Sequence, residues 1–190
     1  EDKNGEIWIG TLDGFIIIKD PKKIFSPDFR CDRIKIPRND GTNNADYLLD
    51  GEQINAIAVD IANRKWIATE TSGVYLVSED GLETIHHFNT DNSPLLSNKV
   101  ISIAINDQNG EVFFGTENGI ISFVTEVTEP AENLDSIRVY PNPVRPDYKG
   151  IITIRNLKEN TNVKILDLAG NAVYETTSLG GTAIWDYQNQ

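Results

Sequence analysis

Apolar and polar positions alternate in short runs through residues 1–125, and one such run occurs three times. Its copies are Trp8-Ile9-Gly10-Thr11, Trp66-Ile67-Ala68-Thr69 and Phe113-Phe114-Gly115-Thr116. Each copy is followed by a glycine and a second apolar run, which predicts a strand, a tight turn and an antiparallel partner strand. The positions that define the repeat are Trp8, Gly10, Thr11, Gly14, Trp66, Thr69, Gly73, Phe113, Gly115, Thr116 and Gly119.

The repeat has the length of a propeller blade. Thr11 and Thr69 are 58 residues apart, and Thr69 and Thr116 are 47 apart. A period of roughly 40–50 residues built from short strands is typical of a blade. Two more strands per repeat are expected, at 31–36, 53–60, 83–88 and 99–106. The sequence therefore predicts about two and a half four-stranded blades, an incomplete β-propeller, because a closed ring needs roughly four to eight.

A different spacing follows residue 135. Five short apolar runs about 10–12 residues apart predict an immunoglobulin-like β-sandwich, here incomplete. We therefore expect an all-β chain with propeller blades at 1–127, an acidic linker at 128–135 and a truncated sandwich at 136–190. The prolines in the first run fix φ and exclude a helix. The residues that mark the sandwich are Tyr140, Pro141, Asn142, Pro143, Asp167, Gly170 and Trp185.

The net charge of −12 and the pI near 4.5 argue against nucleic acid as a partner, because binding to phosphates requires clustered Lys and Arg. The single cysteine, Cys31, excludes an internal disulfide, and we expect it in the core. No run approaches the ~20 apolar residues of a membrane span. The chain opens on a polar turn, without Met or a signal peptide, so we expect it to be a fragment whose partners include the rest of its own propeller.

No pattern of residues predicts an enzyme or a cofactor. His86 and His87 lie next to each other on an expected strand and point to opposite faces, so they cannot chelate one ion. The acids of Glu79-Asp80 and of the Asp46/Asp50 pair are best explained as turn residues, although glycoside chemistry would also need paired carboxylates. Serines are present, but none lies in a nucleophile elbow.

Two binding hypotheses remain open beside the structural ones. The polar loop from Asp40 to Asp46 carries enough oxygen ligands for Ca²⁺, but it lacks the twelve-residue calcium pattern, so a solvated loop is the simpler interpretation. Trp8, Trp66 and Phe113 are candidates for a sugar-stacking stripe. Their identical place in each repeat favours packing between blades.

The segment 98–119 resembles the repeat of the two-component-regulator type propellers of Bacteroidetes, with the pattern V-x-x-I, D-x-x-G, W-I-G-T, G-L. The second copy departs from it with Ala68 and Arg64 in place of glycines, and the third with Phe113 in place of tryptophan. The resemblance covers roughly residues 1–125. It implies a propeller and says little about function.

The motif Tyr140-Pro141-Asn142-Pro143, with residues 163–170 and 181–186, resembles the C-terminal sandwich of Bacteroidetes type IX secretion proteins. Propeller and sandwich together resemble the propeller family of the type IX attachment complex. This implies a non-enzymatic scaffold at the periplasm or outer-membrane surface of a Gram-negative bacterium, holding sortase and anionic lipopolysaccharide. The alternatives are a periplasmic sensor of a hybrid two-component regulator, and exported cargo with a sorting domain.

Overall fold

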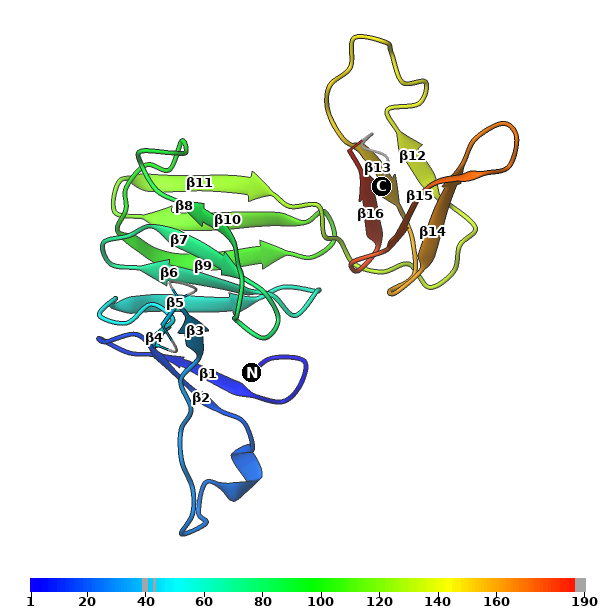
Figure 1. The fold of residues 1–190 in the computed structure, drawn as a ribbon. Helices are drawn as coiled ribbons and strands as arrows, with labels where there is room; N and C mark the ends of the chain where they lie inside the picture. Colours follow the sequence, from blue (N-terminus) through cyan, green and yellow to red (C-terminus); the bar gives the residue numbers. More distant parts are fainter. Residues whose placement is uncertain (39–40, 43, 187–190) are drawn as a thin grey trace. The chain divides into compact units, whose positions relative to one another are not determined.

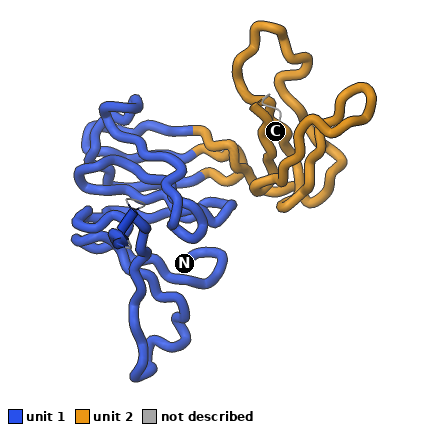
Figure 2. The backbone as a smooth tube through the Cα atoms, viewed as in Figure 1, with its two compact units in different colours: residues 1–105, 112–123 blue, residues 106–111, 124–190 orange. Residues whose placement is uncertain are grey.

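The computed structural model describes residues 1–38, 41–42 and 44–186, and the chain divides into two compact units. The first unit comprises residues 1–105 and 112–123, and the second comprises 106–111 and 124–190 (Figure 2). The second unit includes part of the expected linker: Gly181 N–H donates to the Thr128 carbonyl at 2.7 Å, and Glu129 N–H donates to the Asp107 carbonyl at 2.8 Å.

The middle of the first unit is a four-stranded antiparallel sheet in which consecutive strands are neighbours (Figure 1). Short connections and strands rich in Ile, Val and Trp favour this meander, which is the form of a propeller blade. It confirms the predicted all-β fold with propeller blades. Its strands, in order, are β5 (Ile54–Val59), β6 (Lys65–Thr69), β7 (Val74–Val77) and β8 (Thr84–Phe88).

Partial sheets lie on both sides of this blade in the sequence. The earlier part has two separate strand pairs and a short 3₁₀ helix, and the later part has three strands in the order β11-β10-β9. These open sheets agree with an incomplete propeller. The elements are β1 (Ile7–Gly10), β2 (Phe15–Ile18), η1 (Pro21–Lys23), β3 (Lys35–Pro37), β4 (Ala45–Tyr47), β9 (Val100–Asn106), β10 (Glu111–Thr116) and β11 (Gly119–Val124).

Two expectations in the first repeat were wrong. The strand expected from residue 31 begins only at Lys35, and before it Asp32 forms an isolated bridge with Ile17. Cys31 is exposed and not part of the core. Residue 31 follows the loop after η1, and in this stretch only Asp32 exchanges backbone hydrogen bonds with β2 before β3 begins. Cys31 is therefore not held in a sheet.

One turn precedes the first copy of the repeat strand, and the same turn precedes the second and third. Each has a residue with left-handed backbone three positions before the repeat aromatic: Gly5 (φ 81°), Asn63 (φ 60°) and Gly110 (φ 72°). The side chains of Asp2 and Asp60 accept backbone N–H groups inside the first two turns. The left-handed position of the second copy is therefore Asn63, and the expected replacement of glycine by Arg64 was wrong. Asn adopts this conformation more readily than most residues.

A second turn follows each repeat strand and explains the repeated threonine. The threonine hydroxyl donates to the carbonyl of the turn glycine, at 2.9 Å for Thr11, 2.9 Å for Thr69 and 2.8 Å for Thr116. The glycine itself has a positive φ and donates its N–H to the next repeat: Gly14 donates to the Glu52 carbonyl at 2.7 Å, and Gly73 to the Asn98 carbonyl at 2.9 Å.

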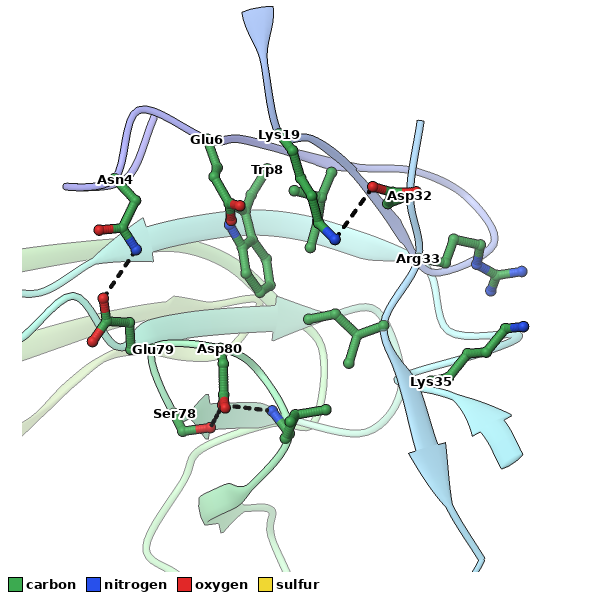
Figure 3. Close-up of a pocket in the computed structure, with 13 residues that line it drawn as sticks. Asn4, Glu6, Trp8, Lys19, Asp32, Arg33, Lys35, Ser78, Glu79 and Asp80 are labelled. Atoms are coloured by element: carbon green, nitrogen blue, oxygen red, sulfur yellow. Dashed lines mark hydrogen bonds and ion pairs between the residues drawn. The ribbon is translucent and has the colours of Figure 1, made fainter. Parts of the chain in front are cut away.

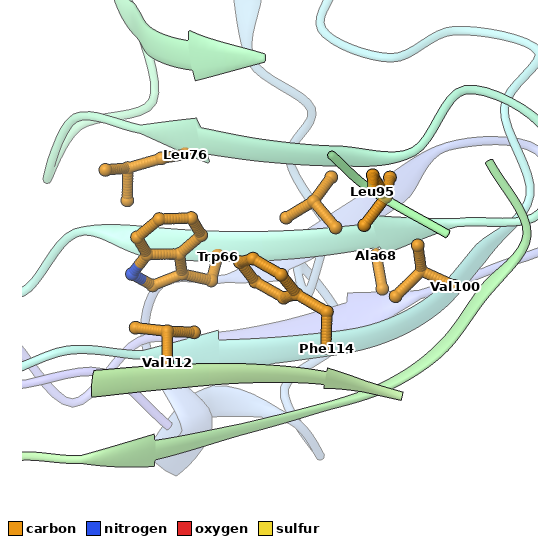
Figure 4. Packing of buried hydrophobic residues seen from close by; sticks show 8 residues of the cluster. Trp66, Ala68, Leu76, Leu95, Val100, Val112 and Phe114 are labelled. Carbon is orange, nitrogen blue, oxygen red and sulfur yellow. The ribbon is translucent and has the colours of Figure 1, made fainter. Parts of the chain in front are cut away.

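The core of the first unit lies between neighbouring sheets. On β6, Trp66 packs with Phe114 of β10 (Figure 4). Ile67, the next residue of β6, belongs to the cluster that contains Trp8 of β1. Adjacent strand residues point to opposite faces, so β6 serves both packing interfaces. Phe113 occupies the repeat position of Trp66 and is 37% exposed, whereas Phe114 is 3% exposed.

The second unit contains two small antiparallel sheets, one with the order β12-β13-β16 and one with β14-β15. Ile154, Leu157 and Ala183 form its buried cluster, with Val163 and Ile165 packed against them. The elements are β12 (Arg138–Tyr140), β13 (Ile152–Arg155), β14 (Asn162–Leu166), β15 (Ala172–Thr177) and β16 (Thr182–Trp185). These five strands lie where the sandwich pattern predicted them.

Candidate functional site

The first unit has a cleft of about 650 Å³ at one edge of the first two repeats (Figure 3). Three segments form it: the loop before β1 with the β1–β2 hairpin, the stretch that leads into β3, and the turn after β7. These segments are far apart in the sequence, so the cleft exists only because the first and second repeats pack against each other.

Trp8 is the aromatic residue of this cleft. It is only 8% exposed, its ring stacks on Phe15 with centroids 5.1 Å apart, and the Lys65 ammonium lies 4.8 Å from its centroid. Its Nε1 is buried without a hydrogen-bond partner among the described residues. Trp8 therefore contributes mainly to packing. Trp66 is fully buried, so these tryptophans do not form an exposed stripe.

A buried ion pair lies beside Trp8. The Lys65 ammonium is 2.9 Å from the Asp2 carboxylate, and both side chains are 0% exposed. Burial alone raises the pKa of the Asp2 carboxyl, but the hydrogen bond from Lys65 and the backbone N–H groups of Glu6 and Asn4 outweigh it and hold that pKa below its ordinary value. Lys65 also donates to the Glu79 carbonyl at 2.6 Å. The pair thus joins the first turn to the second repeat.

Partnered charges line the rim of the cleft. The Lys19 ammonium is 3.3 Å from the Asp32 carboxylate. The Asn4 amide donates to Glu79 at 2.9 Å, and the Ser78 hydroxyl donates to Asp80 at 2.6 Å (Figure 3). The amide donors Asn4 and Asn63 lower the pKa of Glu79, and the Ser78 hydroxyl, followed by a backbone N–H, lowers the pKa of Asp80.

Glu79 and Asp80 are therefore anions at neutral pH and act as turn residues. A general acid needs a raised pKa near the working pH, and both of these carboxylates are shifted in the opposite direction. The cleft is also lined by the exposed, apolar Leu82 and by the charged side chains of Glu6 and Lys35.

The remaining chemical candidates are engaged elsewhere. His87 stacks on Tyr75 at 4.0 Å and His86 on Phe88 at 5.4 Å. The described residues hold no group of three or more His, Cys, Asp or Glu side chains able to bind a metal ion. The Asp46 carboxylate accepts from Arg38 and that of Asp50 from Arg33. Of the Asp40–Asp46 loop in the calcium hypothesis, Asp40 and Asn43 lie outside the described residues.

The sandwich motif lies at the end of β12 and in the loop after it. Tyr140 ends the strand, and Pro141 and Pro143 line a hollow of about 410 Å³ in that loop. The Asp167 carboxylate accepts backbone and side-chain N–H groups of Asn171 in the turn between β14 and β15, and Gly170 takes the positive φ there. These residues shape turns and strand ends.

Sequence reasoning missed two charged pairs. One is Asp2 with Lys65, for which the signal was a lysine directly before the repeat tryptophan and an aspartate at the start of the first two repeat turns. The other is Arg138 with Arg155, which lie directly opposite each other on β12 and β13. A cluster of basic residues in an acidic chain was its signal.

Comparison with known proteins shows what this architecture resembles. Residues 138–184 match the family model of the secretion system C-terminal sorting domain. PorZ of Porphyromonas gingivalis, described as an essential bacterial surface component of the type IX secretion system, is 35% identical over 99% of this chain, with a TM-score of 0.71. The chain is PorZ-like. This chain spans 25% of the length of the PorZ chain.

Other comparisons add little to the PorZ-like assignment. Two extracellular domains from B. thetaiotaomicron, described as parts of a hybrid two-component and a one-component system, are 16% and 14% identical over 98% and 99% of this chain. This chain covers 33% and 26% of theirs, and each TM-score is 0.41. No curated protein matches significantly. No helix among the described residues is long and apolar enough to cross a membrane.

Proposed function

We propose that this PorZ-like chain is part of an extracytoplasmic protein that is associated with type IX secretion and acts as a binding scaffold at the cell surface. The observation that carries the proposal is the 35% identity to PorZ over 99% of the chain. The sorting-domain match at 138–184 is independent support. Both the blades and the sandwich are thus aligned with one surface component of a secretion system.

In its finer form, the proposal is that the protein holds the sortase and anionic lipopolysaccharide together during cargo attachment, without catalysis and without a bound cofactor. The cleft supports binding without chemistry, because Glu79 and Asp80 have lowered pKa values and stay ionised. Packed blades also provide a rigid frame on which loops can carry binding residues.

Affinity capture from outer-membrane extract tests this proposal. The intact protein is immobilised, and bound material is analysed for sortase by mass spectrometry and for lipopolysaccharide by gel staining. We expect both to be retained. A variant with the cleft altered, Leu82→Asp, shows whether the cleft takes part. Recovery of neither sortase nor lipopolysaccharide contradicts the scaffold proposal.

A second candidate is exported cargo that carries the sandwich as a sorting signal, and the match at 138–184 favours it. Mass spectrometry of the mature protein on the cell surface separates the two. A scaffold keeps residues beyond about 130, whereas sorted cargo loses them. The sensor alternative has no observation of its own in this structure.

A further inference from the structure

Two arginines face each other across neighbouring strands of the second unit. In the antiparallel pair β12–β13, Arg138 is directly opposite Arg155, Val139 is opposite Ile154, and Tyr140 is opposite Thr153. Directly opposed residues have side chains on the same face, with Cβ atoms about 4.5–5.5 Å apart. Because Ile154 belongs to the buried cluster, the two arginines project from the other face of the sheet.

Nothing among the described residues neutralises this pair. No described carboxylate lies within ion-pair distance of either guanidinium. On the far side of β13, the residue opposite Arg155 is Thr182, whose hydroxyl lies 2.8 Å from that of Thr128. The next neighbour on this face is therefore a satisfied threonine and not an acid. Like charges directly opposite each other destabilise a sheet.

Arg155 retains unused donor capacity. Its guanidinium carbon lies 5.5 Å from the centroid of the Tyr140 ring, a cation–π contact that does not use the N–H groups as hydrogen-bond donors to an oxygen. Its Nε is buried and has no hydrogen-bond partner among the described residues. A buried donor without a partner is costly. An anion bound by the two guanidinium groups would relieve the repulsion between them.

The sequence segment that carries the pair is opposite in charge to the whole chain. The chain carries −12, yet residues 136–155 contain four basic residues, Arg138, Arg145, Lys149 and Arg155, and one acid, Asp147. The field of an acidic protein repels anions. An anionic ligand therefore needs a local positive charge, which Arg138 and Arg155 supply together on one face of the β12–β13 pair.

We propose that Arg138 and Arg155 form an oxyanion site that binds a phosphate or carboxylate group of an anionic ligand. Each guanidinium presents N–H donors in a planar fork that matches two oxygens of such a group. Two forks on adjacent strands hold one oxyanion between them, and its negative charge removes the repulsion. This site goes beyond the proposed scaffold function and does not depend on it.

Isothermal titration of the full chain with inorganic phosphate, at constant ionic strength in chloride, tests the site. We expect saturable binding, weakened at least about tenfold by Arg138→Gln, because a hydrogen bond to a charged group has been removed. Arg155→Lys keeps the charge but loses the fork, and should weaken binding similarly. The matched control is Arg145→Gln, a nearby basic residue outside the strand pair, which should leave the affinity unchanged.

Thermal unfolding provides a second readout. Without phosphate, Arg138→Gln should raise the midpoint because the repulsion is gone, and added phosphate should raise the midpoint of the unaltered chain only. Acetate and a sugar phosphate, used as separate probes, distinguish carboxylate from phosphate sources. The proposal is overturned if no probe binds, if Arg138→Gln leaves binding intact, or if Arg145→Gln weakens it equally. Since Arg138 is exposed on its strand, its replacement should not prevent folding.

Discussion

The buried pair between Asp2 and Lys65 makes the sharpest stability prediction. In Asp2→Asn, the Lys65 ammonium stays buried at 0% exposure but loses the carboxylate 2.9 Å away. Removing one partner of a buried pair costs about 3–5 kcal/mol. In this variant Lys65 still has its hydrogen bond to the Glu79 carbonyl, 2.6 Å long, and its cation–π contact with the Trp8 ring at 4.8 Å. We therefore expect Asp2→Asn to lower the free energy of unfolding by the lower end of this range, about 3 kcal/mol.

Urea unfolding followed by tryptophan fluorescence measures this cost. Trp8 and Trp66 lie in the first unit and Trp185 in the second, so Trp185→Phe in every sample restricts the signal to the first unit. With a slope of about 1–3 kcal/mol per M of urea, the midpoint should fall by about 1–3 M. The double variant Asp2→Leu with Lys65→Met should recover most of the loss, because replacing a whole buried pair by apolar groups is often neutral.

The pH dependence has a defined sign. The pKa of Asp2 is lowered in the folded state from an ordinary value of 3.8. Its stabilising contribution is therefore complete above that value and is lost as the pH falls through the folded-state pKa. The difference between the unaltered chain and Asp2→Asn should be constant near neutrality and shrink below about pH 4. A cost under about 1 kcal/mol at pH 7, or a difference that grows on acidification, would refute the buried pair.

Three further predictions concern packing and turns. Gly73→Ala places a Cβ against the backbone oxygen of Phe88, whereas Gly51→Ala has a similar positive φ and open space. We expect Gly73→Ala to lower the unfolding midpoint several times more than Gly51→Ala, and equal effects would argue against the close approach. Phe114→Ala should cost about 3–5 kcal/mol and the more exposed Phe113→Ala under about 1 in urea titrations, and a reversed order would contradict the packing described. Thr182→Val leaves the buried Thr128 hydroxyl without its partner and should cost about 1–3 kcal/mol in urea unfolding followed by far-UV circular dichroism, and an unchanged midpoint would contradict that hydrogen bond.

Local patterns made the blades predictable. The order aromatic, small residue, Thr, then Gly predicted each hairpin, because the threonine hydroxyl and the glycine φ both belong to one short turn. The left-handed place of Asn63 was missed because Asn can substitute for Gly there, and the neighbouring Arg64 was taken for that position. The exposure of Cys31 was missed because it depends on where the chain rejoins β2.

The candidate sites were harder to predict, because they join residues distant in sequence. Asn4 meets Glu79 and Asp2 meets Lys65 only after two repeats have packed together. The opposition of Arg138 and Arg155 depends on strand register, and a slip of one residue would send the side chains to opposite faces. The composition showed that residues 136–155 are rich in basic residues, but it could not show that Arg138 and Arg155 lie opposite each other.

The bonds from Gly14 to the Glu52 carbonyl and from Gly73 to the Asn98 carbonyl are made by main-chain atoms alone. A backbone hydrogen bond of this kind does not depend on the side chain of the residue whose carbonyl accepts it. Successive repeats can therefore diverge widely, as Ala68 and Phe113 have done at positions held by glycine and tryptophan in other copies. Residues on the outer surfaces of these blades can therefore change, and with them the binding partners, while the backbone hydrogen bonds between the repeats stay the same.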